Sequence, residues 1–516
     1  MKKGFFTLLA GVMMSAQMMA VTTQDVCGRY DGMLNISGQA YPNKQVYLLP
    51  GTVDNTVTFV LPDFTFVAKG KLGNIVLPNI PMDASGKLTL ENSTLYLDSI
   101  QERATITVLN GLEDGGIVYN SIVTDNEAQV LLQIGAPSLP QPILVLFQGV
   151  ATTGKNYAIQ NGGFEGAWTN NEPQAWHSFG TATGIMADFV LDNTYQFVAS
   201  TDVRPSTSGS QSALLSSNML MGVKANGNCT NGQINAGSMT ADAPADNYNF
   251  SDPTNAGYNT PLQGRPDSLV FWAKYVPADK NPANEVNRAR ASVVLTTDAR
   301  YQDPETANFG EARIAKAEIN FAATAEMGWQ RLAVPFLYNS EDMPAYILTT
   351  FTTNQVPGGG SSYSIGSSFN KVNVVDSVYL DDVELVYNKE LSQFTKDGVG
   401  LEFLHRVATL ESNYCDDCAK FAAVADGRSA QTFIAFDAAH KCIYIYVIAD
   451  DYQQSGDYRL YRVEFANSQA GDLNPLNQAV EMTETDQLPS QKVMINGHLY
   501  IQKGDAIFDV TGRKVN

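Results

Sequence analysis

The chain has 516 residues, in which 33 Lys and Arg stand against 53 Asp and Glu, and its formal net charge is −20. Negative charge on this scale repels phosphate backbones, so nucleic-acid binding is excluded as a general activity. The length predicts about three or four domains. The low share of charged residues, the many glycines and the scarcity of 3.6-residue apolar spacing predict an all-β protein.

The first twenty residues have the pattern of a secretory signal peptide. Lys2 and Lys3 precede an apolar stretch over 4–14, and small residues follow up to Ala20, after which we expect cleavage. The apolar stretch is too short to cross a bilayer, and no later segment reaches the ~20 apolar residues that a transmembrane helix needs. We therefore predict an exported protein without a transmembrane helix, at the cell surface or outside the cell. A periplasmic location and association with the outer-membrane surface stay open.

Residues 21–152 are predicted to form a small closed β-barrel. Short alternating strands are joined by turns of Asn, Asp, Gly and Pro. The segments GRYDGML, VTFVLPDFTF, LGNIVLPNIPM and ILVLFQG resemble the calycin-like (lipocalin-like) barrel domain of exported Bacteroidetes proteins. This resemblance implies a barrel that either holds a small apolar ligand or is filled by its own side chains. Strands are expected at 45–49, 56–61, 73–77, 86–90, 104–109, 127–134 and 143–149.

The largest unit, residues 160–388, carries an ordered series of motifs. They are NGGFE at 161–165, then EPQAWHSFG, SALLSS, ANGNCTNGQI, DNYNF, LQGRPDSLVFWAKY and WQRLAVPFLY, and finally DSVYLDDVEL at 376–385. The series resembles the carbohydrate-metabolism domain of exported and surface proteins of gut Bacteroidetes. That resemblance implies a jelly-roll-like β-sandwich akin to carbohydrate-binding modules, a glycan partner and no shared set of catalytic residues.

Carboxylates in the first and last of these motifs suggest a structural calcium site. In related jelly-roll modules a Ca²⁺ is held by a glutamate of the first strand and an aspartate of the last, which implies Glu165 with Asp381 or Asp382 here. Adjacent residues of a regular strand point to opposite faces, so only one of the two aspartates can reach a given ion. The alternative is that these carboxylates cap turns or face solvent.

All four tryptophans of the chain fall in this unit. Sugar recognition uses flat aromatic faces beside a few hydrogen-bonding groups. Trp168 and Trp176 flank a turn of Asn, Glu and Pro, where binding loops tend to cluster, so we predict both as ligand-binding residues. His177 follows Trp176 and is predicted to bond a sugar hydroxyl. Trp272 and Trp329 belong to strand patterns and are predicted to lie in the core or on a sheet face.

Motifs of known catalytic sites are lacking. The chain has no GxSxG, HExxH or P-loop, no GxGxxG between a strand and a helix, and only four histidines. We predict no catalytic residues and interpret the protein as an exported, non-catalytic glycan-binding or glycan-handling surface protein. Two alternatives stay open. One is a secreted enzyme of the glycoside hydrolase type, because the pairing of two carboxylates is a matter of geometry. The other is a structural or adhesive surface protein.

Residues 389–488 are predicted to form a further β-rich domain, and they resemble no family. CDDC at 415–418 and HKC at 440–442 could supply a Cys₃His zinc set. Export favours a disulfide or free thiols instead. The pairing pattern is open for the five cysteines, which leave one unpaired in any arrangement: Cys27, Cys229, Cys415, Cys418 and Cys442.

The C-terminal segment, residues 489–516, is predicted to hold two or three short strands. Asn496-Gly497 and Gly504-Asp505 are good hairpin turns between them. The stretch IFDVTGRKV resembles the end of the C-terminal sorting domain of type IX secretion in Bacteroidetes, which implies secretion and display at the cell surface.

Overall fold

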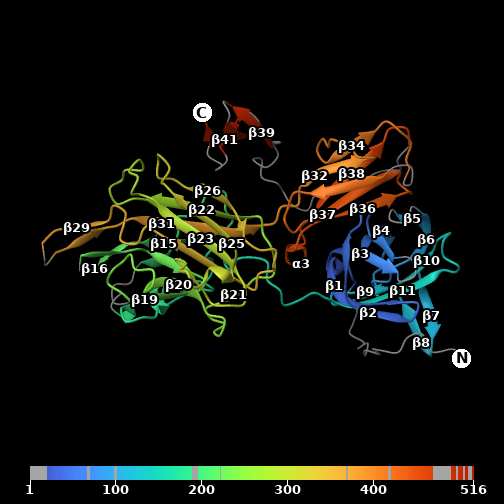
Figure 1. The fold of residues 1–516 in the computed structure, drawn as a ribbon, viewed down its shortest axis with the longest axis horizontal. Helices are drawn as coiled ribbons and strands as arrows, with labels where there is room; N and C mark the ends of the chain where they lie inside the picture. Colours follow the sequence, from blue (N-terminus) through green and yellow to red (C-terminus); the bar gives the residue numbers. More distant parts are fainter. Residues whose placement is uncertain are drawn as a thin grey trace. The chain divides into compact units, whose positions relative to one another are not determined.

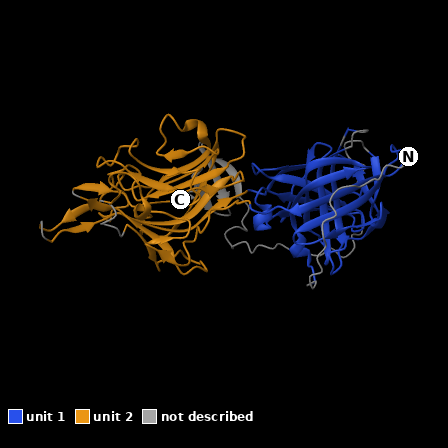
Figure 2. Cartoon of the chain, turned by 90° about the horizontal axis from the view of Figure 1, so that it is seen from below, with its two compact units in different colours: residues 1–154, 388–481 blue, residues 155–387, 482–516 orange. Residues whose placement is uncertain are grey.

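The protein is almost entirely β-structure, as Figure 1 shows, and the all-β prediction is confirmed. The two units of the chain, residues 1–154 with 388–481 and residues 155–387 with 482–516, are coloured separately in Figure 2. The computed structural model describes residues 20–66, 70–97, 102–188, 196–220, 222–367, 370–415, 420–468, 490–495, 498–503, 506–509 and 514–515. The predicted signal peptide lies outside these residues, except for Ala20. No helix among them is long and apolar enough to cross a membrane.

The first unit begins with an antiparallel sheet that curls into a nearly closed barrel, preceded by the short helix α1 (Thr23–Val26). Apolar residues alternate along its strands and point inward, where Phe59, Ile75 and Phe147 are among the buried residues that fill the interior. A pocket of about 220 Å³ opens beside Leu34, Phe64 and Lys44. In sheet order the strands are β4 (Gly70–Pro81), β3 (Thr56–Phe66), β2 (Gln39–Pro50), β1 (Gly28–Ile36), β11 (Ile143–Ala151), β10 (Glu127–Gly135), β6 (Glu102–Val108) and β5 (Leu90–Leu97), with β9 (Ile122–Val123) on β10 and a separate hairpin of β7 (Asn110–Asp114) and β8 (Ile117–Asn120).

Residues 388–468 belong to the same unit and pack on the outside of this barrel. Tyr446 and Tyr452 lie in an apolar cluster with Leu49 and Val60 of the barrel, and the Tyr452 hydroxyl donates to the Leu48 carbonyl at 3.0 Å. Two sheets and one short helix form this part: β33 (Val399–Gly400), β32 (Leu391–Lys396) and β35 (Phe421–Ala425); β34 (Val407–Leu410), β38 (Arg459–Phe465), β37 (Cys442–Ile448) and β36 (Gln431–Asp437); and α3 (Tyr452–Ser455).

The described cysteines give no support to a zinc site. Cys415 is disulfide-bonded, so its sulfur is not available as a thiolate ligand. Cys27, Cys229 and Cys442 are free thiols, and burial raises the pKa of Cys442 to about 12. Cys418 lies outside the described residues.

The second unit contains a β-sandwich whose two main sheets enclose one apolar core. Inward residues such as Phe271, Val293 and Phe351 alternate with polar residues that face outward, as expected for packed antiparallel sheets. The first sheet contains β14 (Phe197–Ser200), β15 (Ser212–Ser216), β31 (Ser377–Val386), β22 (Ser268–Val276) and β26 (Gln330–Pro335). The second contains β18 (Asn228–Thr230), β28 (Tyr346–Thr352), β23 (Ala289–Thr296), β25 (Arg313–Phe321) and β27 (Leu337–Tyr338), with β21 (Thr260–Pro261) on β28.

A third, smaller sheet of this unit runs over part of the second sheet. Asn249 joins the two, because its side-chain amide donates to the hydroxyl of Thr350 at 3.2 Å. The small sheet contains β19 (Gln233–Ala236), β20 (Asn247–Ser251) and β24 (Tyr301–Asp303). Short pairs and turns complete the unit: β12 (Trp168–Thr169) with β13 (Glu172–Pro173), β16 (Asn218–Leu220) with β17 (Val223–Ala225), β29 (Tyr363–Ile365) with β30 (Val372–Val374), and the 3₁₀ turns η1 (Phe179–Thr181) and η2 (Gly310–Ala312).

The C-terminal segment forms an antiparallel sheet of its own. Consecutive strands pair along the chain as in hairpins, but the segment has four described strands where two or three were predicted, and both predicted turns lie outside the described residues. The strands are β39 (Ser490–Ile495), β40 (His498–Lys503), β41 (Ala506–Asp509) and β42 (Lys514–Val515). The resemblance to a sorting domain stays a prediction.

Candidate functional site

A cleft of about 560 Å³ lies between the outward face of the second sheet and the small sheet β19-β20-β24. Its floor comes from alternate positions of the strands. Along β25, Ala315 and Ala317 point into the sandwich core, whereas Lys316 and Glu318, which alternate with them, line the cleft. Successive side chains of a strand point to opposite faces, so the same strand builds the core and the site.

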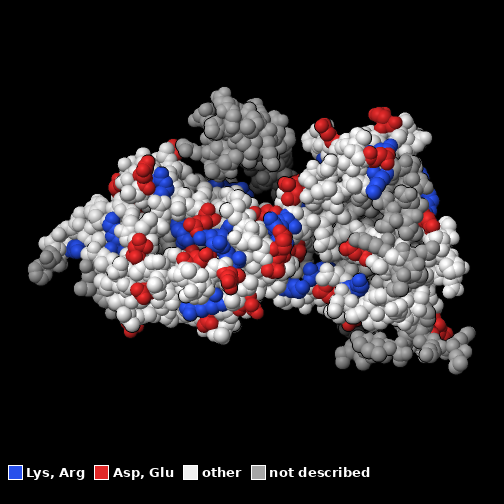
Figure 3. Space-filling view, viewed as in Figure 1, with Lys and Arg blue, Asp and Glu red and all other residues white. Residues whose placement is uncertain are grey.

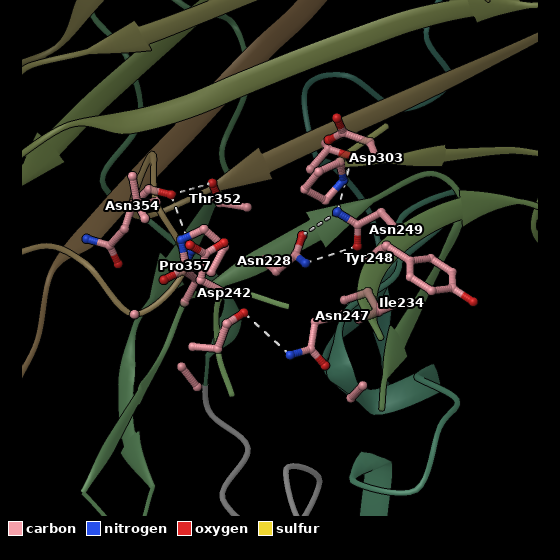
Figure 4. A pocket seen from close by; sticks show the side chains of 18 of the residues that line it. Asn228, Ile234, Asp242, Asn247, Tyr248, Asn249, Asp303, Thr352, Asn354 and Pro357 are labelled. Atoms are coloured by element: carbon pink, nitrogen blue, oxygen red, sulfur yellow. Dashed lines mark hydrogen bonds between the residues drawn. The ribbon is translucent and has the colours of Figure 1, made fainter. Parts of the chain in front are cut away.

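Asparagine side chains form the centre of this cleft. Asn228 of β18 and Asn249 of β20 bond each other in both directions, at 3.0 and 3.2 Å, across two sheets. Figure 4 shows this pair, with Asn354 and Pro357 on one side and Tyr248 on the other. The mutual bonds hold both amides in one orientation. Asn228 is only partly buried, and its amide keeps a second N–H beyond this pair.

A buried ion pair fixes one wall. Arg290 of β23 donates to both carboxylate oxygens of Asp303 at 2.8 and 2.7 Å, and to Glu318 at 3.1 Å. Lys316 also pairs with Glu318. Burial alone would raise the pKa of Glu318, but the positive charges of Arg290 and Lys316 hold that pKa below its usual value. Glu318 is therefore ionised at neutral pH.

Two further asparagines shape the rim of the cleft. The Asn247 side chain accepts from the N–H groups of Gly237 and Ser238 and donates to the Thr240 carbonyl, so it holds the loop after β19. Asn354 donates to the buried carboxylate of Asp376 at 3.1 Å, which positions the loop that continues to Gly358. An apolar wall completes the site: Leu220, Ile234, Met239, Val356 and Pro357.

Trp176 lies in the core and not on a binding surface. Its side chain has 0% exposure, packs against Phe164 and Phe351, and donates from Nε1 to the Asn161 carbonyl at 3.0 Å. The ring has no face left for a sugar. Trp168 is half-buried, packs against Phe197 and donates to the Phe164 carbonyl. Neither tryptophan lines the cleft.

His177 is held by its protein neighbours. Its two ring nitrogens lie 3.3 Å from Glu172 and 2.9 Å from the Gly257 carbonyl, and the ring packs edge-on against Tyr258. Glu172 is itself buried and accepts from the N–H and hydroxyl of Ser178. This network organises the loop after β13, and His177 does not line the cleft.

The first and last motifs of the sandwich do meet, as their sequence suggests. The Val383 N–H donates to the Gly162 carbonyl at 2.9 Å, and a Cβ at Gly162 would lie 1.9 Å from the Val383 oxygen, so only glycine fits there. Glu165, Asp382 and Glu384 line one polar pocket of about 420 Å³. Asp381 is buried beside it, and burial raises its pKa.

In the described structure these carboxylates are engaged by protein groups. Asp382 is paired with the guanidinium of Arg204, which lies over the ring of Trp272 at 5.4 Å. Both oxygens of Glu165 accept hydrogen bonds, from Ser210 and Gln211. Among the described residues, no group of three or more His, Cys, Asp or Glu could hold a metal. Calcium binding here stays a prediction, and Arg204 is the cation that the described structure places beside Asp382.

Chelation with EDTA is expected to leave the thermal midpoint of the protein unchanged within about 1 °C, because Arg204 already neutralises Asp382. Arg204→Ala should lower the midpoint by about 2–4 °C, the size expected for a partly buried ion pair. Added Ca²⁺ should then raise the midpoint of this variant but not that of the wild type, since its carboxylates have lost their cation. Differential scanning calorimetry with and without Ca²⁺ measures both. A wild-type midpoint that falls by several degrees in EDTA would restore the calcium site.

The residues of the cleft could have been found in part from the sequence. ANGNCTNGQI and DNYNF contain Asn228, Tyr248 and Asn249, and both motifs are asparagine-rich stretches inside strand patterns. The alternation of charge and alanine in AKAE at 315–318 marks a strand with a charged outward face. No sequence signal shows that these three segments line one cleft, because their pairing is set by the tertiary structure.

No protein-family model matches the chain, and no curated protein matches it significantly. Partial structural similarity exists to a provisionally assigned glycoside hydrolase from Bacteroides thetaiotaomicron, with 14% identity, 68% of this chain and 99% of that chain covered, and a TM-score of 0.33. Similarity to carbohydrate-binding modules of the β-sandwich superfamily has 8% identity and a TM-score of 0.22, and it covers 70% of this chain and 99% of that chain. Similarity to a provisionally assigned outer membrane protein from Bacteroides fragilis has 15% identity and a TM-score of 0.18, and it covers 25% of this chain and 52% of that chain. These TM-scores carry no functional argument, and the family resemblances stay predictions.

Proposed function

We propose that the protein is an exported, non-catalytic glycan-binding protein of the cell surface, and that the glycan binds in the cleft around Asn228. The observation that carries the proposal is the oriented pair Asn228 and Asn249 on the floor of a 560 Å³ cleft. The sequence of residues 1–20 supports export, and the motif series of 160–388 supports a role with carbohydrate.

The chemistry of the cleft suits a sugar. Pyranose rings present hydroxyl groups that donate and accept hydrogen bonds, together with C–H faces that pack on apolar surface. Amide side chains offer both a donor and an acceptor, and their mutual bonds pre-organise them so that little entropy is lost on binding. The apolar wall with Ile234 and Pro357 lies beside these amides. A cavity with an apolar wall and a few convergent polar groups is typical of a small-ligand site.

The ion pairs favour binding over hydrolysis. Glycoside hydrolysis needs one carboxyl group that stays protonated near neutral pH, which requires a raised pKa. Glu318 has a lowered pKa, and Asp303 is held by two bonds from Arg290. These two carboxylates serve to hold the wall of the cleft.

A glycan array screened with the full chain tests the proposal, followed by calorimetric titration of the best ligand. Asn228→Ala should weaken binding by about tenfold or more, because it removes a hydrogen bond and frees Asn249. Gln355→Ala is a second cleft variant whose half-exposed side chain can be lost without damage to the fold, and a weakening of severalfold is expected.

Asn373→Ala is the matched control. Asn373 is an exposed asparagine of the same sandwich that bonds Asn218 and does not line the cleft, so its loss should leave affinity unchanged. Thermal unfolding of each variant separates lost binding from lost folding. A blank array, or equal affinity of both cleft variants and wild type, would overturn glycan binding at this site and favour a structural or adhesive role.

A further inference from the structure

We infer that the cleft selects uncharged glycans and rejects acidic ones such as uronates, sialosides and sulfated chains. The inference rests on the proposed function, because it names the class of glycan for the same site. It follows from how the charged residues that line the cleft are engaged.

Each of the three cations that line the cleft in the described part of the chain is engaged by a protein group. Arg290 makes two bonds to Asp303 and one to Glu318, and only 12% of its side chain is exposed. Lys316 pairs with Glu318, and Lys224 donates from Nζ to the Gly360 carbonyl at 2.8 Å. An acidic ligand would have to break one of these contacts, and the bidentate Arg–carboxylate geometry is the strongest of them.

The cleft carries no excess of positive charge among its described residues. Three cationic side chains line it against four anionic ones. Glu305 accepts from the Tyr301 hydroxyl and from Arg313, each at 2.8 Å, whereas Asp242 is exposed on the loop that Asn247 holds. On the face drawn in Figure 3, Lys and Arg side chains of the sandwich are interspersed with Asp and Glu. A carboxylate or sulfate that enters the cleft meets the exposed carboxylate of Asp242, and each lining cation that the structure describes already bonds a protein group.

Neutral ligands do not meet this barrier. Beside the charged pairs, the floor offers uncharged amide groups, of which Asn228 is partly buried and keeps one N–H beyond its bond to Asn249. Such groups bond a sugar hydroxyl at no electrostatic cost. We therefore assign Asp303 and Glu318 as specificity-determining residues, which act by neutralising Arg290.

Paired glycans that differ only in charge test the inference. The full chain is screened against acidic polysaccharides and against the same samples after carboxyl reduction or desulfation. At least a tenfold preference for the neutral member is expected. Binding of the neutral member should change less than about twofold between 50 and 500 mM salt, since few charges are involved.

Glu318→Gln supplies the reverse test. It frees Lys316 and part of Arg290, so affinity for the acidic member should rise severalfold. Glu326→Gln, an exposed glutamate of the same sandwich outside the cleft, is the control and should change neither affinity.

Two outcomes would overturn the inference in distinguishable ways. If the acidic member binds as tightly as the neutral one, and Asn228→Ala abolishes that binding, the charge selection is wrong while the proposed function stands. If no sample binds, both fail.

Discussion

Asp376→Ala is expected to lower the free energy of unfolding of the sandwich by about 3–5 kcal/mol, because a buried charge that accepts many bonds leaves its donors unpaired when it is removed. The Asp376 carboxylate is fully buried at the start of β31. It accepts from six groups: the N–H of Ala278, the side-chain amide of Asn354, and the N–H and hydroxyl of both Ser361 and Ser362.

The same substitution should also weaken glycan binding. Asn354 would lose its anchor, and the loop 354–358 that forms one wall of the cleft would no longer be held. Urea unfolding followed by tryptophan fluorescence reports on this unit alone, since all four tryptophans lie in it. Asp342→Ala is the control, because Asp342 is exposed and bonds only Ser340 among the described residues. A loss below about 1 kcal/mol for Asp376→Ala, within the range of ordinary surface changes, would contradict this account.

Trp176→Ala is expected to cost about 3–5 kcal/mol as well, the range for a fully buried large aromatic residue. Removal of the indole leaves a cavity beside Phe164 and Phe351 and removes one of the two hydrogen bonds that the Asn161 carbonyl accepts. Trp329→Ala is a matched control at a half-buried ring that bonds Asp202, and we expect less than half the loss.

Glycan affinity distinguishes this role of Trp176 from a binding role. The folded fraction of Trp176→Ala should bind as tightly as the wild type, measured by calorimetric titration below the unfolding transition. Unchanged stability together with lost affinity would show instead that the ring contacts the sugar.

Most features of this fold that could be predicted from the sequence were predicted from strand patterns and glycines. Apolar strand patterns in 56–61 and 143–149 predicted strands of the barrel, whereas the burial of Phe59 and Phe147 in its interior depends on the strand register. The sequence also indicated that NGGFE and LDDVEL belong to one sandwich. They do meet in the structure, because Gly162 allows the close approach of Val383.

The candidate site was much less accessible to prediction. Trp176 follows a turn of polar residues, and that context is typical of an exposed loop. The loop instead folds over the end of the sandwich, where Phe164 and Phe351 cover the ring. Burial of a loop residue depends on contacts distant in sequence, and local composition does not contain them.

The sequence by itself determined the all-β class and which side chains share a face of each strand, because a strand alternates with period two wherever it lies. Because Ala315 and Ala317 point into the core, Lys316 and Glu318 must point to the opposite face of the strand. Only the tertiary structure decided that β20 crosses near β18, so that Asn249 meets Asn228 and a polar sheet face becomes the floor of a cleft. Register between strands far apart in the chain depends on packing of the whole sandwich, and no local pattern specifies it.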